Sequence, residues 1–112
     1  MDKKYKVINE KAFASQVEDL LKIFGWRYSH FRPAWTEKGW RTPLSGDKGF
    51  PDYVAVRQGK LFFIELKSES GKITPSQQEW LDALYELVDD SGMIKVYIWR
   101  PSQIEEIAYI LK

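Results

Sequence analysis

An aspartate and a Glu-x-Lys triplet mark the ends of two neighbouring apolar stretches in this chain. Asp52 opens the stretch 53–56, and Glu65 and Lys67 interrupt the end of the stretch that follows Gly59. A glycine between two such stretches is typical of a β-hairpin. Antiparallel pairing places the start of one strand beside the end of the next, so Asp52 is expected close to Glu65. Two buried carboxylates repel each other, and a divalent cation relieves that repulsion.

The residues around these three extend the pattern. It comprises Gly49-Phe50-Pro51-Asp52, Glu65-Leu66-Lys67, Gly71-Lys72, Thr74-Pro75-x-Gln77, Trp80-Leu81 and Trp99-Arg100-Pro101. Together they resemble the PD-(D/E)xK nuclease superfamily, and in particular small stand-alone members of its VRR-NUC branch, over about residues 10 to 105. The resemblance implies an α/β fold with a restriction-endonuclease-like core in the order αβββαβ(α). Its central sheet is mixed, four-stranded and flanked by helices, within one domain over residues 1–112.

The resemblance also implies a metal site and a role for the lysine. Asp52 and Glu65 are the expected metal ligands, with the backbone carbonyl of Leu66 as a further one, and hard oxygen donors favour Mg²⁺ or Mn²⁺. Lys67 is expected to orient the attacking water and to stabilise charge on the phosphate. On the residues alone, a simple salt bridge between Glu65 and Lys67 at a strand edge stays open, as does a lysine that only covers the sheet.

An acid from the first helix and Gln77 complete the expected catalytic set, and Gln16 is expected to contact DNA. Glu10 matches a glutamate at the start of this helix in the family, and Glu18 is the alternative. Glu10 also has a plain reading, because an acidic residue is favourable at a helix start. Gln16 and Gln77 are candidates for positioning the phosphate, and Gln77 also suits a capping box with Thr74. Glu10 and Gln16 are not at one helical spacing, so they cannot both point at one metal ion.

Basic and aromatic residues outside this set are candidates for contact with DNA. Lys72 and Lys48 each precede a turn or a helix start, where phosphates bind readily. His30, the only histidine, permits a phosphate contact but more often such a residue only packs at a strand end. The segment 32–50 mixes basic and aromatic residues that suit base stacking, although the tryptophans fit folding back onto the core equally well. These residues are Trp35, Lys38, Trp40 and Arg41.

Composition bounds the class of protein. The chain has 112 residues, a formal net charge of +1 and no cysteine. It lacks an apolar run of the roughly 20 residues that a membrane span needs, and no apolar segment follows the N-terminal lysines as in a secretory signal. We therefore expect a cytoplasmic protein of one domain. Basic residues outnumber acidic ones over 27–60, whereas 76–92 carries acidic residues and no basic ones, which suits one face turned toward phosphates.

Periodicity predicts the elements that position these residues. An apolar stripe from Phe13 to Phe24 predicts a helix capped by Asn9 and ended by Gly25, then a strand over 26–31 and a long loop over 32–50. After the hairpin, Thr74 caps a helix with buried Trp80, Leu81, Leu84, Leu87 and Val88. A strand follows over 94–99. A last short helix carries Ile104, Ile107 and Leu111, with a capping box of Ser102 and Glu105.

The leading interpretation is a metal-dependent deoxyribonuclease that is selective for DNA structure, such as Holliday junctions, flaps or nicked and branched DNA. No helix is set up to read bases in the major groove. The resemblance suggests a homodimer, because a junction presents two equivalent strands, and a phage or prophage origin would suit it. Two alternatives are a restriction- or defence-type nuclease directed by sequence or by a partner, and a catalytically silent DNA-binding module of the same fold.

Overall fold

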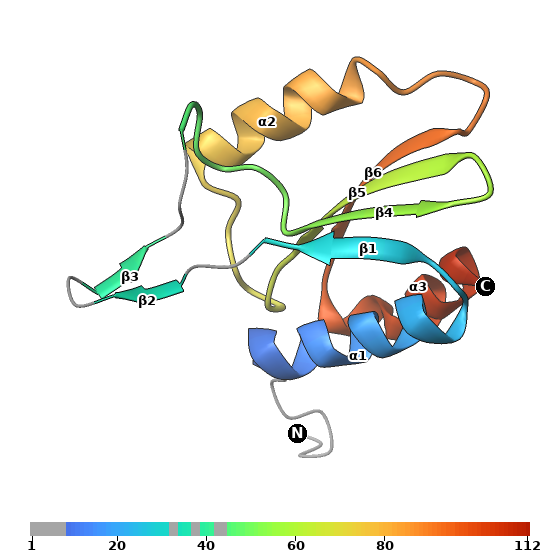
Figure 1. Cartoon of the computed structure of the whole chain (residues 1–112), viewed down its shortest axis with the longest axis horizontal. Helices are drawn as coiled ribbons and strands as arrows, with labels where there is room; N and C mark the ends of the chain where they lie inside the picture. The colour runs from blue at the N-terminus through green and yellow to red at the C-terminus, as the bar shows by residue number, and fades with distance from the viewer. Residues whose placement is uncertain (1–8, 32–33, 37–38, 42–44) are drawn as a thin grey trace.

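The computed structural model describes residues 9–31, 34–36, 39–41 and 45–112, with residues 34–36 and 39–41 as backbone only (Figure 1). Its centre is a four-stranded mixed sheet in the order β1-β4-β5-β6. The strands are β1 (Arg27–His30), β4 (Tyr53–Arg57), β5 (Lys60–Leu66) and β6 (Ile94–Trp99). β4 runs antiparallel to β1 and β5, and β6 runs parallel to β5. The expected mixed sheet of four strands is confirmed.

The hairpin between β4 and β5 fixes the register of the sheet. Gln58 and Gly59 both have positive φ, 51° and 79°, as a two-residue type I′ turn requires. Arg57 therefore pairs with Lys60, and Tyr53 pairs with Ile64 at the far end of the hairpin. This register brings Asp52, which precedes Tyr53, beside Glu65, which follows Ile64.

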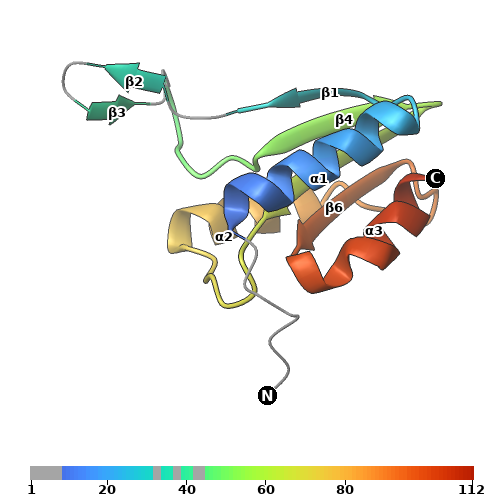
Figure 2. The ribbon, with the colours of Figure 1, turned by 90° about the horizontal axis from the view of Figure 1, so that it is seen from below.

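Two helices cover one face of the sheet, below it in Figure 1 and in front of it in Figure 2. They are α1 (Glu10–Ile23), capped by Asn9, whose side chain accepts a hydrogen bond from the Ala12 N–H, and α3 (Ile104–Leu111). Their apolar stripes meet alternate residues of the strands in the main core. That core includes Phe13, Val17, Leu21, Ile64, Trp99, Ile107 and Leu111. Each large side chain that is fully buried there stabilises the fold by roughly 1.5–3 kcal/mol.

The opposite face of the sheet carries α2 (Pro75–Tyr85) and a smaller core. Leu81 and Leu84 of the helix pack with Val96 of β6. The helix begins with the predicted capping box, in which Thr74 and Gln77 exchange hydrogen bonds between side chain and backbone. Because α2 and the pair α1 and α3 lie on opposite faces, the sheet is the middle of three layers.

The segment 32–50, which the sequence predicts to be a long loop, contains a second sheet. Its strands β2 (Ala34–Thr36) and β3 (Gly39–Arg41) pair antiparallel. Figures 1 and 2 both show this hairpin projecting beyond the end of the main sheet at which β4 begins. The prediction of a structureless loop is therefore wrong, because each strand is only three residues long and shows too few residues for a period-2 pattern.

At two helix ends the structure also differs from the sequence prediction. The capping box of Ser102 and Glu105 does not form, because a 3₁₀ turn over Pro101–Gln103 precedes α3 and the Gln103 side chain accepts from the Arg100 N–H at 2.8 Å. The second helix ends at Tyr85, so Leu87 lies beyond it and is exposed. Among the described residues, no helix is long and apolar enough to cross a membrane.

Candidate active site

Asp52 and Glu65 lie together where β4 begins and β5 ends. They flank the last pair of the hairpin, Tyr53 with Ile64. One carboxylate oxygen of Asp52 accepts a hydrogen bond from the Leu66 N–H at 2.8 Å, which ties the two strand ends together. Glu65 is the one buried charged residue among those the structure describes, with 2 % of its surface exposed.

Burial raises the pKa of both carboxyl groups, and the charge of Asp52 adds to the rise at Glu65. The pKa of Glu65 rises to about 8, first because burial disfavours its charge and second because the charge of Asp52 lies nearby, with Lys67 opposing both effects. Burial likewise raises the pKa of Asp52, against the opposing effect of the Leu66 N–H. At neutral pH the protein itself therefore does not hold both groups fully ionised. A bound cation would favour the doubly ionised state.

Two side chains lie close to the carboxylate of Glu65, one from just after the end of the same strand and one from α2. The Lys67 ammonium lies 4.0 Å from Glu65 Oε2, and the Gln77 amide nitrogen donates to the same oxygen at 3.1 Å. The amide oxygen of Gln77 simultaneously accepts from the Thr74 N–H at 3.0 Å. The predicted capping role of Gln77 is therefore confirmed, and the other end of its amide holds the carboxylate of Glu65.

These groups line a cavity of about 870 Å³ that opens between α1 and the start of α2. All three layers of the fold contribute. Its lining residues are Glu10, Lys11, Ala14, Ser15, Glu18, His30, Asp52, Glu65, Leu66, Lys67 and Gln77. This cavity collects a lysine, a histidine and several carboxyl groups, two of which, Asp52 and Glu65, have raised pKa values. A cavity of this size and composition is a candidate active site.

The two candidate acids of α1 have different surroundings. Glu10 is exposed at the first position of the helix, and its charge contributes to the raised pKa of Asp52. Glu18 accepts hydrogen bonds from the hydroxyls of Tyr53 at 2.6 Å and Tyr28 at 3.1 Å. Because these donors already engage both oxygens of Glu18, Glu10 is the more accessible oxygen donor toward the carboxylate pair.

Glu18 instead orients His30. The His30 Nδ1 lies 3.0 Å from Glu18 Oε2, within ion-pair distance although not aligned for a hydrogen bond. The imidazole also stacks on Tyr53, with ring centroids 4.1 Å apart and an interplanar angle of 13°. A positive charge on His30 lowers the pKa of Asp52, so the imidazole lies within electrostatic range of the carboxylate pair.

The donor set fits a hard divalent cation. Asp52, Glu65 and the carbonyl of Leu66 are oxygen donors, and a cation would favour the ionised forms of the two carboxyl groups, whose pKa values burial raises. Within the described residues no three His, Asp or Glu side chains converge as a complete metal site. Magnesium does not need one, since it commonly takes one or two carboxylates and completes its shell with water and substrate phosphate.

Other predicted site residues lie elsewhere. Gln16 lines a shallow groove between α1 and α3 instead of the cavity, because the helix turns it away from Glu10 and Glu18. Lys48 lines a separate pocket beside α2, and Lys72 is exposed in the loop before that helix. Arg41 belongs to β3 but its side chain is not among those described, and Lys38, Trp35 and Trp40 also have side chains outside the described part.

The structure adds residues that the sequence did not single out. The hydroxyls of Tyr28 and Tyr53 hold Glu18. Tyr28 and His30 are two residues apart on β1, so the alternation of side chains along a strand could have placed them on one face. Arg100, noted only as part of the wider pattern, donates from one nitrogen to the carbonyls of Ser68 at 2.6 Å and Gly71 at 2.7 Å. It therefore fixes the loop that follows Lys67.

Comparison with known proteins agrees with this geometry. A family model of the VRR-NUC domain matches residues 5–100, which is most of the chain. A search of curated proteins finds no match.

Proposed function

Because this chain belongs to the VRR-NUC domain family, a family of nucleases, we propose that it is a Mg²⁺- or Mn²⁺-dependent endonuclease that cleaves branched or nicked DNA. The observation that carries the proposal is the pair of half-buried Asp52 and buried Glu65, whose pKa values are both raised, beside Lys67. Such a pair is costly in a protein without a function for it, and a cation with a phosphate would offset the cost.

Asp52, Glu65 and the Leu66 carbonyl would hold the cation, and Glu10 would approach it through water or directly. A divalent ion in such a site would polarise the phosphate and lower the pKa of a bound water. The protein's own groups have separate tasks. Gln77 keeps Glu65 turned toward Asp52, as its hydrogen bond at 3.1 Å indicates. Lys67 stabilises charge that develops on the phosphate and orients the attacking water.

Selectivity for DNA structure follows from what surrounds the cavity. It opens between the N-terminal ends of α1 and α2, and the β2–β3 hairpin projects from the same end of the sheet (Figure 1). None of the described helices stands out from the body as a recognition helix for the major groove. We therefore propose recognition through the shape and the backbone of DNA, and a homodimer that offers two sites to a junction.

The test is digestion of a panel of junction, flapped, nicked, single-stranded and linear DNAs with Mg²⁺, with Mn²⁺ and with chelator. Cleavage of branched forms that requires metal is expected, and Asp52→Asn should abolish it. Light scattering with and without a junction measures the oligomer. DNA binding without cleavage of any substrate would instead indicate a catalytically silent module, and cleavage limited to one linear sequence would indicate a nuclease of the restriction type.

A further inference from the structure

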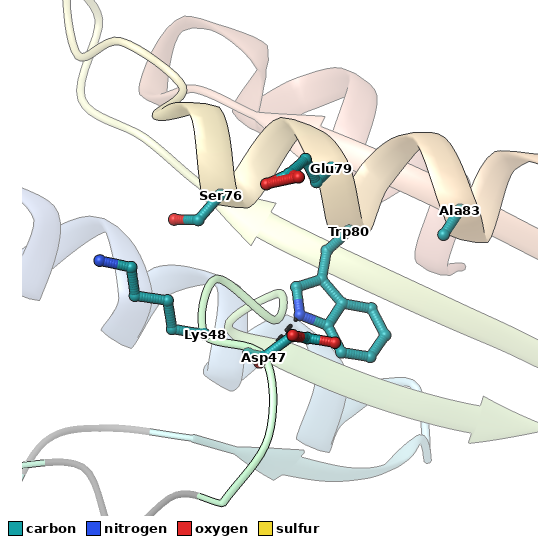
Figure 3. A pocket seen from close by; sticks show the side chains of 6 residues that line it. All are labelled: Asp47, Lys48, Ser76, Glu79, Trp80 and Ala83. Atoms are coloured by element: carbon teal, nitrogen blue, oxygen red, sulfur yellow. Dashed lines mark hydrogen bonds between the residues drawn. The ribbon is translucent and has the colours of Figure 1, made fainter.

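A second pocket, of about 280 Å³, lies beside the first turns of α2, apart from the catalytic cavity (Figure 3). Its lining residues are Asp47, Lys48, Ser76, Glu79, Trp80 and Ala83. We propose that this pocket binds one unpaired base of the DNA, stacked on Trp80, and prefers bases that carry an exocyclic amino group. This inference rests on the proposed function, and it narrows the substrate to DNA with an unpaired nucleotide near the cleaved phosphate.

The pocket is preformed. One wall is a single stripe of α2, because Ser76, Glu79, Trp80 and Ala83 follow the i, i+3, i+4, i+7 spacing of one helix face. The other wall is formed by Asp47 and Lys48 of the segment 47–50, and the Trp80 indole N–H donates a hydrogen bond to the Asp47 carbonyl 3.1 Å away.

Glycine makes this contact between the two walls close. A Cβ on Gly49 would lie 2.6 Å from the backbone carbon and oxygen of Ser76, so no other residue fits between the segment and the helix. The Phe50 ring supports the indole edge to face, with centroids 4.9 Å apart. Because both walls are fixed before any ligand arrives, binding would require little ordering of the protein.

Size and shape favour a single base. The volume lies just below the roughly 300–1,000 Å³ of typical small-molecule sites, so the pocket suits one base and part of its sugar. In Figure 3 the flat indole forms the wall at one end, while the Lys48 ammonium and the Ser76 hydroxyl lie toward the other. Aromatic side chains stack with any base, and a lysine at the edge of the stack suits the phosphate of the same nucleotide.

The charged side chains of the pocket determine which bases it would prefer. Asp47 and Glu79 supply two carboxylates against the one ammonium of Lys48, so the pocket does not suit a group that is only anionic. Carboxylates accept hydrogen bonds from the amino groups of bases. Cytosine, adenine and guanine carry such a group and thymine does not, which gives the expected preference.

The pocket also adjoins the catalytic residues along the chain. Lys48 belongs to the segment that leads into Asp52, and Ser76 directly precedes Gln77, which holds Glu65. A base held here therefore belongs to a nucleotide close to the phosphate that the cavity receives. Duplex DNA keeps its bases stacked and paired, whereas a branch point, a flap or a nick releases one at low cost.

The test measures binding of fluorescent single-stranded oligonucleotides in chelator, where no cleavage occurs. The probes are oligo-dC, oligo-dT and an oligo-dC in which abasic sugars replace the central nucleotides. The parent should bind oligo-dC roughly tenfold more tightly than the abasic probe, a typical loss for one stacked base. It should also bind oligo-dC more tightly than oligo-dT.

Two variants and one control locate the effect. Ala83→Phe fills the pocket from an exposed helical position, so it should bind all three probes as weakly as the parent binds the abasic one. Glu79→Gln should lose the preference for oligo-dC over oligo-dT and keep that over the abasic probe. Glu86→Phe adds the same ring to an exposed residue after α2 and outside the pocket, so it should behave as the parent. Circular dichroism and melting temperature check that each variant is folded.

Equal affinity of the parent for the base-containing and abasic probes, or an undiminished difference in folded Ala83→Phe, would overturn the pocket. The nuclease proposal would still stand if the same parent preparation cleaves branched DNA with metal. Conversely, a parent that discriminates between the probes but cleaves nothing would retain the base pocket and refute the nuclease.

Discussion

Glu65 and Asp52 lie at the same end of the β4–β5 hairpin. A proton or a cation is needed there to offset the cost of their negative charges. The pKa of Glu65 moves from 4.5 to about 8 on folding, mainly through burial. The folded protein therefore binds more protons than the unfolded chain throughout that range. We therefore expect the pair to carry a proton at low pH and to become able to bind a cation at higher pH.

The first prediction concerns pH and metal. Since the folded pKa of Glu65 is the higher one, its contribution to the free energy of unfolding is full below about pH 4.5 and is lost as pH rises to about 8. Without metal, stability should therefore decline across this window. If Mg²⁺ binds the ionised pair as proposed, the rise in melting temperature that it causes should grow with pH.

Scanning calorimetry from pH 5 to 8, with Mg²⁺ and with chelator, measures both effects. Glu65→Gln cannot ionise and serves as the control, which should lose the metal response and the pH dependence attributed to this residue. A metal effect of constant size in the parent across the range would refute the link between Glu65 and the cation.

The second prediction concerns Lys67, whose ammonium lies 4.0 Å from Glu65 Oε2. Lys67→Ala should retain the fold, metal binding and most DNA affinity, because in the proposed site Asp52 and Glu65 hold the cation without help from the ammonium. Its single-turnover cleavage rate should fall at least about a hundredfold, the lower scale for a lost acid-base group. Lys67→Arg should restore little, since a planar guanidinium does not replace a compact ammonium. Cleavage at the parental rate by Lys67→Ala would exclude the role.

At the scale of elements, the segment that leads into β4 is held against the start of α2. Gly49 has φ +99° and leaves no space for a side chain against Ser76. The Trp80 hydrogen bond to Asp47 and the Gln77 hydrogen bond to Glu65 complete this junction. The position of Asp52 therefore depends on how closely a loop packs on a helix.

The third prediction uses two glycines of the same segment. Gly49→Ala should displace the segment from α2, which lowers the melting temperature and the cleavage rate together. Gly46 has nearly the same φ, +100°, but open space around it. Gly46→Ala therefore measures the cost of positive φ alone, roughly 1–2 kcal/mol, and should retain activity. If the two variants melt and cleave alike, the close contact at Gly49 does not position the site.

At the scale of the whole molecule, the cavity sits at one end of the sheet, where all three layers contribute to it. α1 brings Glu10 and Glu18, the strands bring Asp52 and Glu65, and α2 brings Gln77. The β2–β3 hairpin extends past the same end (Figures 1 and 2). DNA that reaches the cavity would pass close to this hairpin.

The fourth prediction concerns that hairpin. Replacing Lys38 and Arg41 together by alanine should weaken DNA binding and reduce its salt dependence, because fewer counterions are released. The cleavage rate at saturating DNA should not change, since the proposed catalytic set includes neither residue. Binding isotherms at several salt concentrations measure both quantities. An unchanged salt slope would exclude these two residues from the contact with DNA.

Features that depend on short stretches of chain can be predicted from the sequence alone. The β4–β5 hairpin follows from Gln58-Gly59 between two apolar runs, and the capping box follows from Thr74 and Gln77. Once the hairpin is known, period 2 and antiparallel pairing place Asp52 beside Glu65, so the centre of the site was predictable. The order of the main elements and the family were predictable for the same reason.

Only the tertiary structure decided which side chains from distant elements meet. It directs Gln16 away from the cavity, holds Glu18 with two tyrosines and His30, and closes a pocket between Trp80 and the segment at Gly49. Helix rotation about its axis and the approach of α2 to a loop are set by packing over the whole core. Those contacts join residues far apart in the chain, so no local pattern encodes them.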